Sequence, residues 1–284
     1  MKTKLESFEN LLIEENPSVF CIQETKLRKP NQIKTNSTKH FTIYELLRKN
    51  SSGGGLCIGV HKDLKPVWVS QGDDEVEVLV VEIWVNEFPV RIVTGYGPQV
   101  GDSQERKQKF WDFLEKECYL ALEAGSGFVL QMDSNAHMGK DILKEDPNDQ
   151  NVNGKLFCDF LERMPHLTLV NTLPLCEGSI TRMRKTTRGV EKSILDFFVV
   201  CSKILPFITK MAIDDRREHA LTNYSTVKNL GRVVESDHNV ETLDIDLIFS
   251  NQKPERIQMF DFKNSEGQSA FKILTSNTDE FSKY

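Results

Sequence analysis

Apolar positions along the first 250 residues switch between helical and strand-like spacing. Leu5, Phe8 and Leu12 recur at intervals of three and four residues, which predicts an amphipathic helix over residues 4–14, ended by Pro17. Short apolar runs predict strands at residues 18–25, 53–60, 76–85, 90–98, 127–135, 166–172, 194–200, 207–213 and 240–249. The predicted strands 76–85 and 90–98 are joined by a turn around Asn86.

Two further helices are predicted in the middle of the chain. Asp102 and Glu105 have the spacing of a capping box, so a helix is expected to begin there. Its apolar face carries Phe110, Phe113, Leu114 and Cys118. A shorter helix is predicted over residues 154–163. Many strands, a few intervening helices and long polar loops favour an α/β fold, in which packed β-sheets are flanked by outer helices.

The strand-forming pattern ends near Phe249, and no internal repeat is found before it. We therefore expect one domain over residues 1–249. Residues 250–284 are polar with widely spaced phenylalanines. That composition indicates a linker with helical potential and not a second core.

Composition narrows the class of protein. The 284 residues carry a formal net charge of -6, which excludes a generally basic nucleic-acid binder. Contact with a polyanion then requires a local basic patch or a bound metal cation. Six scattered cysteines without a CxxC pair predict reduced thiols in an intracellular protein. No apolar stretch approaches the ~20 residues of a membrane span, and the acidic first turn is unlike a secretory signal.

Polar residues stand at the ends of several predicted strands. They are Glu24, Tyr96, Asp133, Asn135, Asp196, Asp237 and His238. Catalytic groups of layered α/β proteins commonly gather at one end of the strands. Taken singly, each has a structural alternative: Glu24 as a surface acid, Tyr96 as a packing residue, and the segment 133–135 as an Asp/Asn turn.

Asp196 is more informative, because a carboxylate among Ile, Leu and Phe is costly to bury without a partner. A structural salt bridge is one interpretation, and His238 is the partner we favour. Together the polar residues offer acids for one Mg²⁺, an amide, a phenol and an Asp–His pair, a set that suits hydrolysis of a phosphate ester. The chain has no GxxxxGK[ST] loop, which disfavours a nucleotide-driven motor or a kinase of that kind.

The motifs IQETKL, GYGPQ, MDSNAHMG, SILDFF and SDH, in that order over residues 1–247, resemble the endonuclease/exonuclease/phosphatase family. The resemblance implies a four-layered α/β sandwich. Within the family, NPSVFCIQETKL, GGGLCIGVHKDL and LVNTLP…SITR…SILDFFVVCSKI most resemble the endonuclease domain of LINE-type (non-LTR) retrotransposon polyproteins. The tail RIQMFDFKNSEGQSAFKILTSNT is similar to the segment that joins this endonuclease to its reverse transcriptase, although no reverse-transcriptase motif is present.

The resemblance assigns a role to each position. Glu24 and Asp237 match the metal ligands, Tyr96 the residue that touches the scissile phosphate, Asp133 the residue that handles the attacking water or the leaving oxygen, Asn135 the amide that orients phosphate or water, Asp196 the residue that holds the histidine, and His238 the phosphate-binding histidine. The implied cofactor is Mg²⁺, with Mn²⁺ as the alternative ion.

The chain departs from the family's pattern in three ways. Met132 replaces the glycine of GDxN, which we interpret as a packing change, and Gln99 replaces an asparagine, which moves the amide one methylene outward. The family also begins with a strand ending in a metal-site asparagine, and this chain starts after it, at the first helix. We therefore expect an incomplete sheet and an impaired metal site.

The segment CEGSITRMRKTTRGVEK between two predicted strands is locally basic. It holds Arg182, Arg184, Lys185, Arg188 and Lys192 against two acids. A solvated loop is one interpretation. The other comes from the resemblance, since retrotransposon members have a hairpin here that probes a groove. Arginines on such a hairpin contact phosphates or sense the width of the minor groove.

The sequence thus favours a Mg²⁺-dependent DNA endonuclease that leaves a 3′-hydroxyl and a 5′-phosphate, as the family implies. The 3′ end would prime reverse transcription by the rest of a polyprotein, so the expected partner is DNA and the expected site of action is the nucleus, with no membrane association. Two alternatives stay open. One is an abasic-site repair nuclease, and the other is a non-catalytic remnant that only binds or scaffolds.

Overall fold

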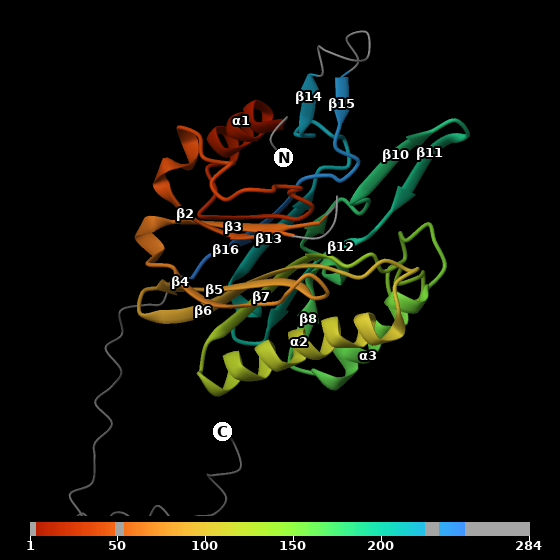
Figure 1. Ribbon diagram of the computed structural model, residues 1–284. Coiled ribbons are helices and arrows are strands. Elements are labelled where there is room, and N and C mark those ends of the chain that lie inside the picture. The colour runs from red at the N-terminus through yellow and green to blue at the C-terminus, as the bar shows by residue number, and fades with distance from the viewer. Residues whose placement is uncertain (1–3, 49–53, 225–232, 248–284) are drawn as a thin grey trace, which may run out of the picture. The chain divides into compact units, whose positions relative to one another are not determined.

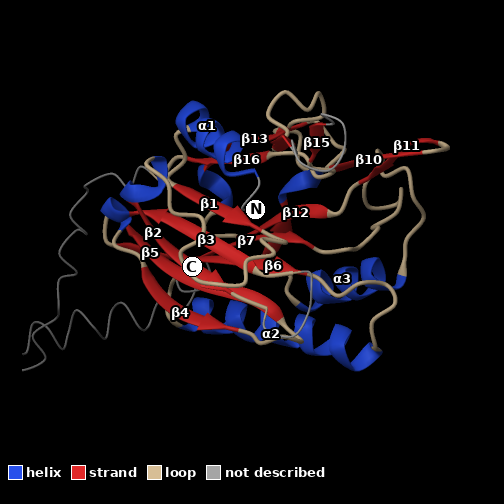
Figure 2. Ribbon diagram, turned by 45° about the horizontal axis from the view of Figure 1, so that its top comes forward, coloured by secondary structure: helices blue, strands red, loops and turns tan. Residues whose placement is uncertain are grey.

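The computed structural model describes residues 4–48, 54–224 and 233–247 (Figures 1 and 2). The helices are α1 (Leu5–Glu15), α2 (Gln104–Glu123) and α3 (Val152–Arg163), with 3₁₀ turns η2 (Ser37–His40), η3 (Lys62–Leu64), η4 (Val170–Thr172) and η5 (Leu205–Phe207). The strands are β1 (Val19–Ile22), β2 (Phe41–Leu46), β3 (Leu56–His61), β4 (Val67–Gln71), β5 (Glu77–Val85), β6 (Phe88–Tyr96), β7 (Gly127–Asp133), β8 (Leu167–Leu169), β9 (Cys176–Glu177), β10 (Arg182–Thr186), β11 (Gly189–Ser193), β12 (Asp196–Cys201), β13 (Ile208–Ile213), β14 (Thr222–Tyr224), β15 (Val233–Glu235) and β16 (Glu241–Ile245).

The described strands build one six-stranded sheet, two three-stranded sheets and the two-stranded pairs β10-β11 and β14-β15. The six-stranded sheet has the order β4-β5-β6-β7-β12-β8, and the three-stranded sheets have the orders β1-β3-β2 and β16-β13-β9. Figure 1 shows α2 and α3 on one side of the large sheet, the smaller sheets on its other side, and α1 outermost. This is the predicted α/β sandwich of packed sheets flanked by helices.

Each helix joins the core through an apolar face. In α1, Phe8 packs edge-on against Phe20 of β1, with the ring centroids 5.2 Å apart. Phe20 lies opposite Gly59 of β3, where a Cβ would come within 2.1 Å of the phenyl ring. On the other side of the molecule, Trp111 of α2 stacks on Phe157 of α3 at 5.1 Å. The glycine in β3 is thus required by the aromatic ring that α1 covers.

All the helices and strands predicted from periodicity are present. The second helix begins one residue later than its predicted cap, because the Ser103 hydroxyl accepts the Arg106 N–H, whereas Asp102 accepts the N–H of Gln99 in the preceding turn. Periodicity did not predict β2, β4, β9, β10, β11, β14 and β15, and the hairpin of β10 and β11 was expected only from the resemblance. The predicted linker 250–284 lies outside the described residues, and the expected incompleteness of the sheet and of the metal site stays a prediction.

Two further facts bear on the class of protein. All six cysteines lie among the described residues and are free. Within the part of the chain that the structure describes, none of the helices combines the length and the apolar character needed to cross a membrane.

Candidate active site

The predicted site residues form a row across the large sheet. Tyr96 at the end of β6 lies beside Asp133 at the end of β7, and Asp133 lies beside Asp196 at the start of β12. Residues in register on neighbouring strands project from the same face of a sheet. Their side chains therefore share one end of the sheet and point toward the layer of smaller sheets. Glu77 of β5 continues the row beyond Tyr96.

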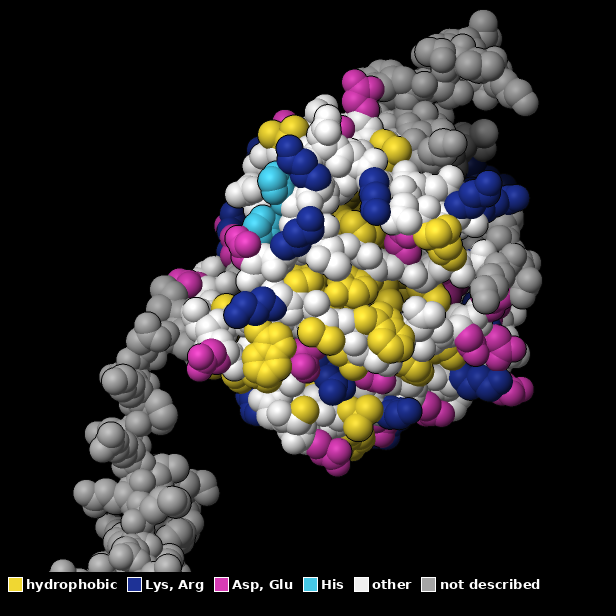
Figure 3. All heavy atoms as spheres, turned by 60° about the vertical axis from the view of Figure 1, so that its left-hand side comes forward, with side chains coloured by type: hydrophobic (Ala, Val, Ile, Leu, Met, Phe, Trp, Pro, Cys, Tyr) yellow, Lys and Arg dark blue, Asp and Glu magenta, His cyan; other side chains and the backbone are white. Residues whose placement is uncertain are grey.

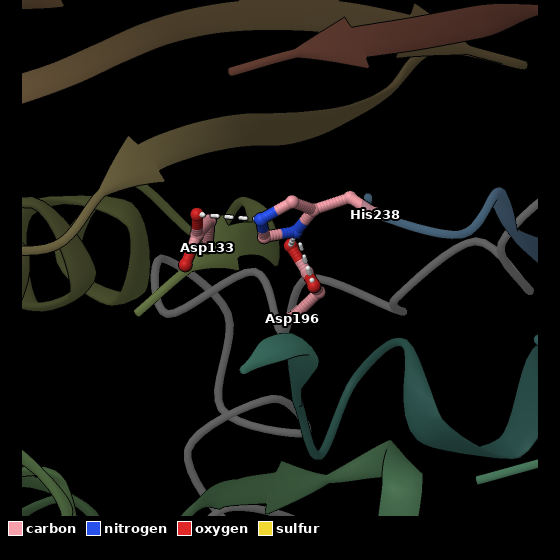
Figure 4. A group of neighbouring side chains, drawn as sticks. All are labelled: Asp133, Asp196 and His238. Atoms are coloured by element: carbon pink, nitrogen blue, oxygen red, sulfur yellow. Dashed lines mark hydrogen bonds and ion pairs between the residues drawn. The ribbon is translucent and has the colours of Figure 1, made fainter. Parts of the chain in front are cut away.

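Asp196 and His238 form the predicted pair (Figure 4). The two oxygens of Asp196 lie 3.1 and 2.9 Å from Nδ1 of His238, and Nε2 of the ring lies 3.7 Å from Oδ2 of Asp133. Burial opposes the charged ring, but the carboxylates of Asp196 and Asp133 outweigh it and raise the pKa of His238 to about 10. The ring is therefore an imidazolium at neutral pH, with Nδ1 donating to Asp196.

Asp133 is almost fully buried, at 4 % exposure. Burial is the largest cause that raises the pKa of its carboxyl, Asp196 adds to it, and the value reaches about 7. The Asp133 carboxyl also accepts the N–H of Asn135, whose backbone lies in the left-handed region at φ 51°. A carboxyl with this pKa exchanges a proton readily near neutral pH, which is the property of a general base.

Asn135 is held tightly behind this carboxyl. Its Nδ2 donates to the carbonyl of Gly97 at 2.8 Å, so the β6 and β7 ends are joined by a side chain as well as by the strand ladder. Gly97 must be glycine, because a Cβ there would lie 2.3 Å from the carbonyl oxygen of Ser134. Left-handed backbone is tolerated by asparagine more than by most residues.

Glu24 follows β1 and bonds across to β6. Its Oε1 accepts the hydroxyl hydrogen of Tyr96 at 2.7 Å, and its Oε2 lies 2.7 Å from Nζ of Lys26. Burial opposes ionisation of Glu24, but the hydrogen bonds from Lys26 and Tyr96 outweigh it and leave the pKa below its ordinary value. Burial, followed by the bond to Glu24, raises the pKa of Tyr96 far above that of a free phenol, so its hydroxyl stays protonated.

A glycine turn positions Glu24. The N–H groups of Thr25 and Lys26 donate to the carbonyls of Gly55 and Gly54, and Gly55 N–H donates to the buried carboxylate of Glu77 at 2.6 Å. Gly54 has φ 75°, and a Cβ on it would lie 2.3 Å from Oε2 of Glu77. Glu77 is only 1 % exposed and is paired with Arg48 at 3.4 Å and Arg106 at 3.8 Å. This buried carboxylate therefore supports the turn under Glu24.

Asp237, the second predicted metal ligand, carries a basic partner. Nε and Nη2 of Arg182 lie 3.0 and 2.9 Å from its Oδ2. Burial opposes ionisation of Asp237, but His238 and Arg182 outweigh it and lower the pKa. Arg182 was predicted to bind DNA, and the structure places its guanidinium at the base of a hairpin, on this carboxylate.

The basic segment forms the hairpin β10–β11, which projects from the body at the right of Figure 1. Arg184, Lys185 and Arg188 are exposed on it, and Lys192 is exposed on its second strand. Lys185 lies 3.6 Å from Glu235. By contrast, the face in Figure 3 has apolar side chains across its middle, and the lysines and arginines drawn there are scattered.

Comparison with known proteins gives a fold and no sequence relative. Neither a scan against protein-family models nor a search of curated proteins found a match. Solved structures do match. The endonuclease domain of TRAS1, a telomere-specific non-LTR retrotransposon, has a TM-score of 0.61 at 16 % identity over 87 % of this chain and 94 % of that one. An AP endonuclease from Archaeoglobus fulgidus has a TM-score of 0.58 at 17 % identity, over 86 % and 95 %.

A third match is an endonuclease/exonuclease/phosphatase family protein from Bacteroides thetaiotaomicron, with a TM-score of 0.55 at 14 % identity, over 86 % of this chain and 90 % of that one. The chain has the endonuclease/exonuclease/phosphatase fold. At these identities the match concerns the fold, and the roles of the residues rest on the geometry described above.

The donor groups of this endonuclease/exonuclease/phosphatase-fold site are suited to a hard cation. Glu24 and Asp237 are held ionised, and Mg²⁺ takes one or two carboxylates of this kind. Among the described residues, the cluster whose donor atoms lie within 4.8 Å of one another is a different set, Asp133, Asp196 and His238. Lys26 and Arg182 now pair with the carboxylates of Glu24 and Asp237. A cation bound by these carboxylates would either displace the two basic groups or share the carboxylate oxygens with them.

Three charged residues of the site, one buried and two partly buried, were missed by the sequence analysis. Glu77 interrupts an apolar run, as Asp196 does, and the same reasoning applies to both. Glu241 lies on the same face of β16 as Leu243 and Ile245. Its carboxylate oxygens have no hydrogen-bond partner among the described residues, and burial raises its pKa. Arg217 stands in the polar run DDRREH, which gives no periodic signal.

Proposed function

We propose that this chain is a Mg²⁺-dependent DNA endonuclease of the LINE retrotransposon type, which cuts one phosphodiester to leave a 3′-hydroxyl and a 5′-phosphate. The row of Tyr96, Asp133 and Asp196 with His238 against it is the observation that carries the proposal. Structural neighbours described as an endonuclease domain and an AP endonuclease support the reaction class. In the cell it would act in the nucleus, as part of a reverse-transcriptase polyprotein.

Each residue then has a task in hydrolysis. His238 is charged at neutral pH and donates to a non-bridging oxygen of the phosphate, while Asp196 fixes the ring through Nδ1. Asp133 accepts a proton from the attacking water. The water oxygen bonds to phosphorus as the bond from phosphorus to the 3′ oxygen breaks, and that oxygen takes a proton from solvent water and leaves as the 3′-hydroxyl.

Tyr96 and Asn135 orient the groups around the phosphate. Tyr96 stays neutral and keeps a hydroxyl hydrogen for donation, and Asn135 holds the carboxyl of Asp133 through its backbone N–H. Glu24 and Asp237 are the residues that would hold Mg²⁺, which supplies neutralisation of charge on the phosphate oxygens. The protein's part is to keep these two carboxylates ionised beside the row.

A synthetic duplex labelled on one strand tests the proposal. With Mg²⁺, the chain should cut plain duplex, and the product should be extended by a DNA polymerase without prior phosphatase treatment, because its 3′ end is a hydroxyl. Cutting confined to a duplex that contains an abasic site would instead identify a repair nuclease. Binding without cutting would identify a DNA-binding module.

A further inference from the structure

Arg217 lies in the loop between β13 and β14, outside every motif that the sequence analysis used. Its side chain is 16 % exposed, and its backbone lies in the left-handed region at φ 61°. Such a conformation is uncommon for arginine and persists where the surroundings hold it. The loop is braced on both sides of Arg217. Asp215 accepts the N–H groups of Ser179 and Ile180, and Asp214 accepts that of His219 at 2.8 Å.

The guanidinium of Arg217 binds four of the five residues in the segment 235–239. Nη2 donates to the carbonyl of Ser236 and lies 3.6 Å from Glu235. Nη1 donates to the carbonyl of Asp237 at 3.5 Å and to Oδ1 of Asn239 at 3.3 Å. The segment 235–239 contains both Asp237 and His238, so one planar group fixes the backbone that carries a predicted metal ligand and the phosphate-binding histidine.

The same guanidinium also reaches the basic hairpin. Nη1 donates to the carbonyl of Met183 on β10 at 3.3 Å. Met183 N–H in turn donates to the carbonyl of Asp237 at 2.7 Å, and Asn239 N–H donates to Thr181 at 2.7 Å. His238 itself forms a β-bridge with Arg182. The segment 235–239 and the base of β10 are therefore one hydrogen-bonded unit with Arg217 at its centre.

We propose that Arg217 is a positioning residue, which holds Asp237 and His238 in register with the base of the β10–β11 hairpin. DNA bound along the hairpin is then presented to His238 at a fixed distance. Lysine cannot replace it fully, because one ammonium cannot occupy the place of Nη1, which contacts β10 and residues 237 and 239, and that of Nη2, which contacts residues 235 and 236. The inference rests on the proposed function, since it concerns the same site, but it makes a structural prediction of its own.

Arg217→Met tests the proposal, with Arg216→Met as the matched control. Arg216 is the neighbouring residue, 86 % exposed, with one acidic partner 4.0 Å away. In Arg217→Met, the kcat of nicking should fall roughly 10²-fold with KM within about twofold of the original, since a misplacement near 1 Å has an effect of that size. The ring resonance of His238, recorded in EDTA, should move. Arg216→Met should change neither.

Two results would overturn the proposal. One is an unchanged kcat in Arg217→Met, and the other is a loss of melting temperature with the His238 resonance in its original position. If Arg217→Met does not fold, Arg217→Lys replaces it, and a smaller fall in kcat with the same shift of the resonance is expected. The two proposals fail separately, because a chain that never cuts DNA still gives the His238 resonance, which reads the role of Arg217 without activity.

Discussion

Asp133 and Asp196 lie directly opposite each other on the antiparallel strands β7 and β12, and both carboxyls are buried. Two carboxylates so placed resist ionising together. Asp196 is compensated by the imidazolium of His238, while Asp133 keeps a pKa of about 7. One sheet position thus supplies the partner of His238, and its neighbour supplies a group that exchanges protons at neutral pH.

The stability of the metal-free protein should fall as the pH rises. The pKa of Asp133 is raised from 3.8 to about 7 and that of His238 from 6.5 to about 10, so the folded protein binds both protons more tightly than the unfolded chain. The Asp133 contribution is fully present below pH 3.8 and is lost as the pH rises through about 7. Urea unfolding in EDTA at pH 5 and pH 8 measures this. Asp133→Asn should show a smaller decrease, and an equal decrease in the two proteins would contradict the assignment.

Asp196→Asn should lower the pKa of His238 and slow cutting. Among the groups that raise this pKa, Asp196 is the largest, and its loss also releases Nδ1 from its acceptor. NMR titration in EDTA should show the His238 resonance titrating well below pH 10. Nicking should fall by roughly 10²–10⁴-fold. A His238 midpoint that does not move would show that Asp196 is not the group that holds the ring charged.

Glu77→Ala should weaken both the fold and the site. It leaves the buried N–H of Gly55 without its acceptor, which costs about 1–3 kcal/mol, and it removes the carboxylate shared by Arg48 and Arg106. Nicking should fall as well, because the glycine turn holds the backbone next to Glu24. Thermal melting and initial rates measure the two effects.

The control for Glu77 is Glu75→Ala. Glu75 lies two residues earlier, is 60 % exposed and pairs with Lys109 at the surface. Substitutions of this kind usually change stability by less than about 0.5 kcal/mol. If the two alanine variants cut and melt alike, the glycine turn does not depend on Glu77.

Replacing Arg184 and Arg188 together with Ala should weaken binding to DNA and leave the chemical step intact. Each phosphate contact that is lost should reduce the slope of log K against log salt by roughly 0.9, and KM should rise with little change in kcat. Fluorescence anisotropy over a range of salt concentrations measures the slope. The matched control is the double variant Lys116→Ala, Lys155→Ala, two exposed lysines on α2 and α3. Equal slopes in the two double variants would show that the hairpin is a solvated loop without phosphate contacts.

Hydrophobic periodicity predicted the strands that build the centre of the fold, since β5, β6, β7 and β12 are long or bounded by clear turns. It did not predict β4, whose side chains are largely exposed and whose pairing with β5 is irregular between Trp68 and Ser70. It did not predict β9 either, which has two residues. Short and irregular edge strands leave too few alternating positions to be recognised.

The sequence likewise predicted some residues of the site and missed the partners of others. Glu24, Tyr96, Asp133 and Asp196 end or begin apolar runs, so their meeting at one end of the sheet follows from strand order. The partners of the charged groups do not follow, because Lys26 on Glu24 and Arg182 on Asp237 depend on side-chain geometry. The position of Arg217 depends on a left-handed residue in a charged loop, and a charge run is normally solvated.

Nicking of supercoiled plasmid by the purified chain tests the central claim most directly. With Mg²⁺ the plasmid should become an open circle, EDTA should stop the reaction, and His238→Ala should cut at least roughly 10²-fold more slowly. His219→Ala is the control. The His219 ring lies beside Glu14 and Glu15, and its backbone N–H donates to Asp214, so these contacts involve none of the predicted site residues. The account predicts wild-type cutting by His219→Ala and near loss of cutting by His238→Ala. Equal cutting by both variants, or by the wild type in EDTA, would contradict it.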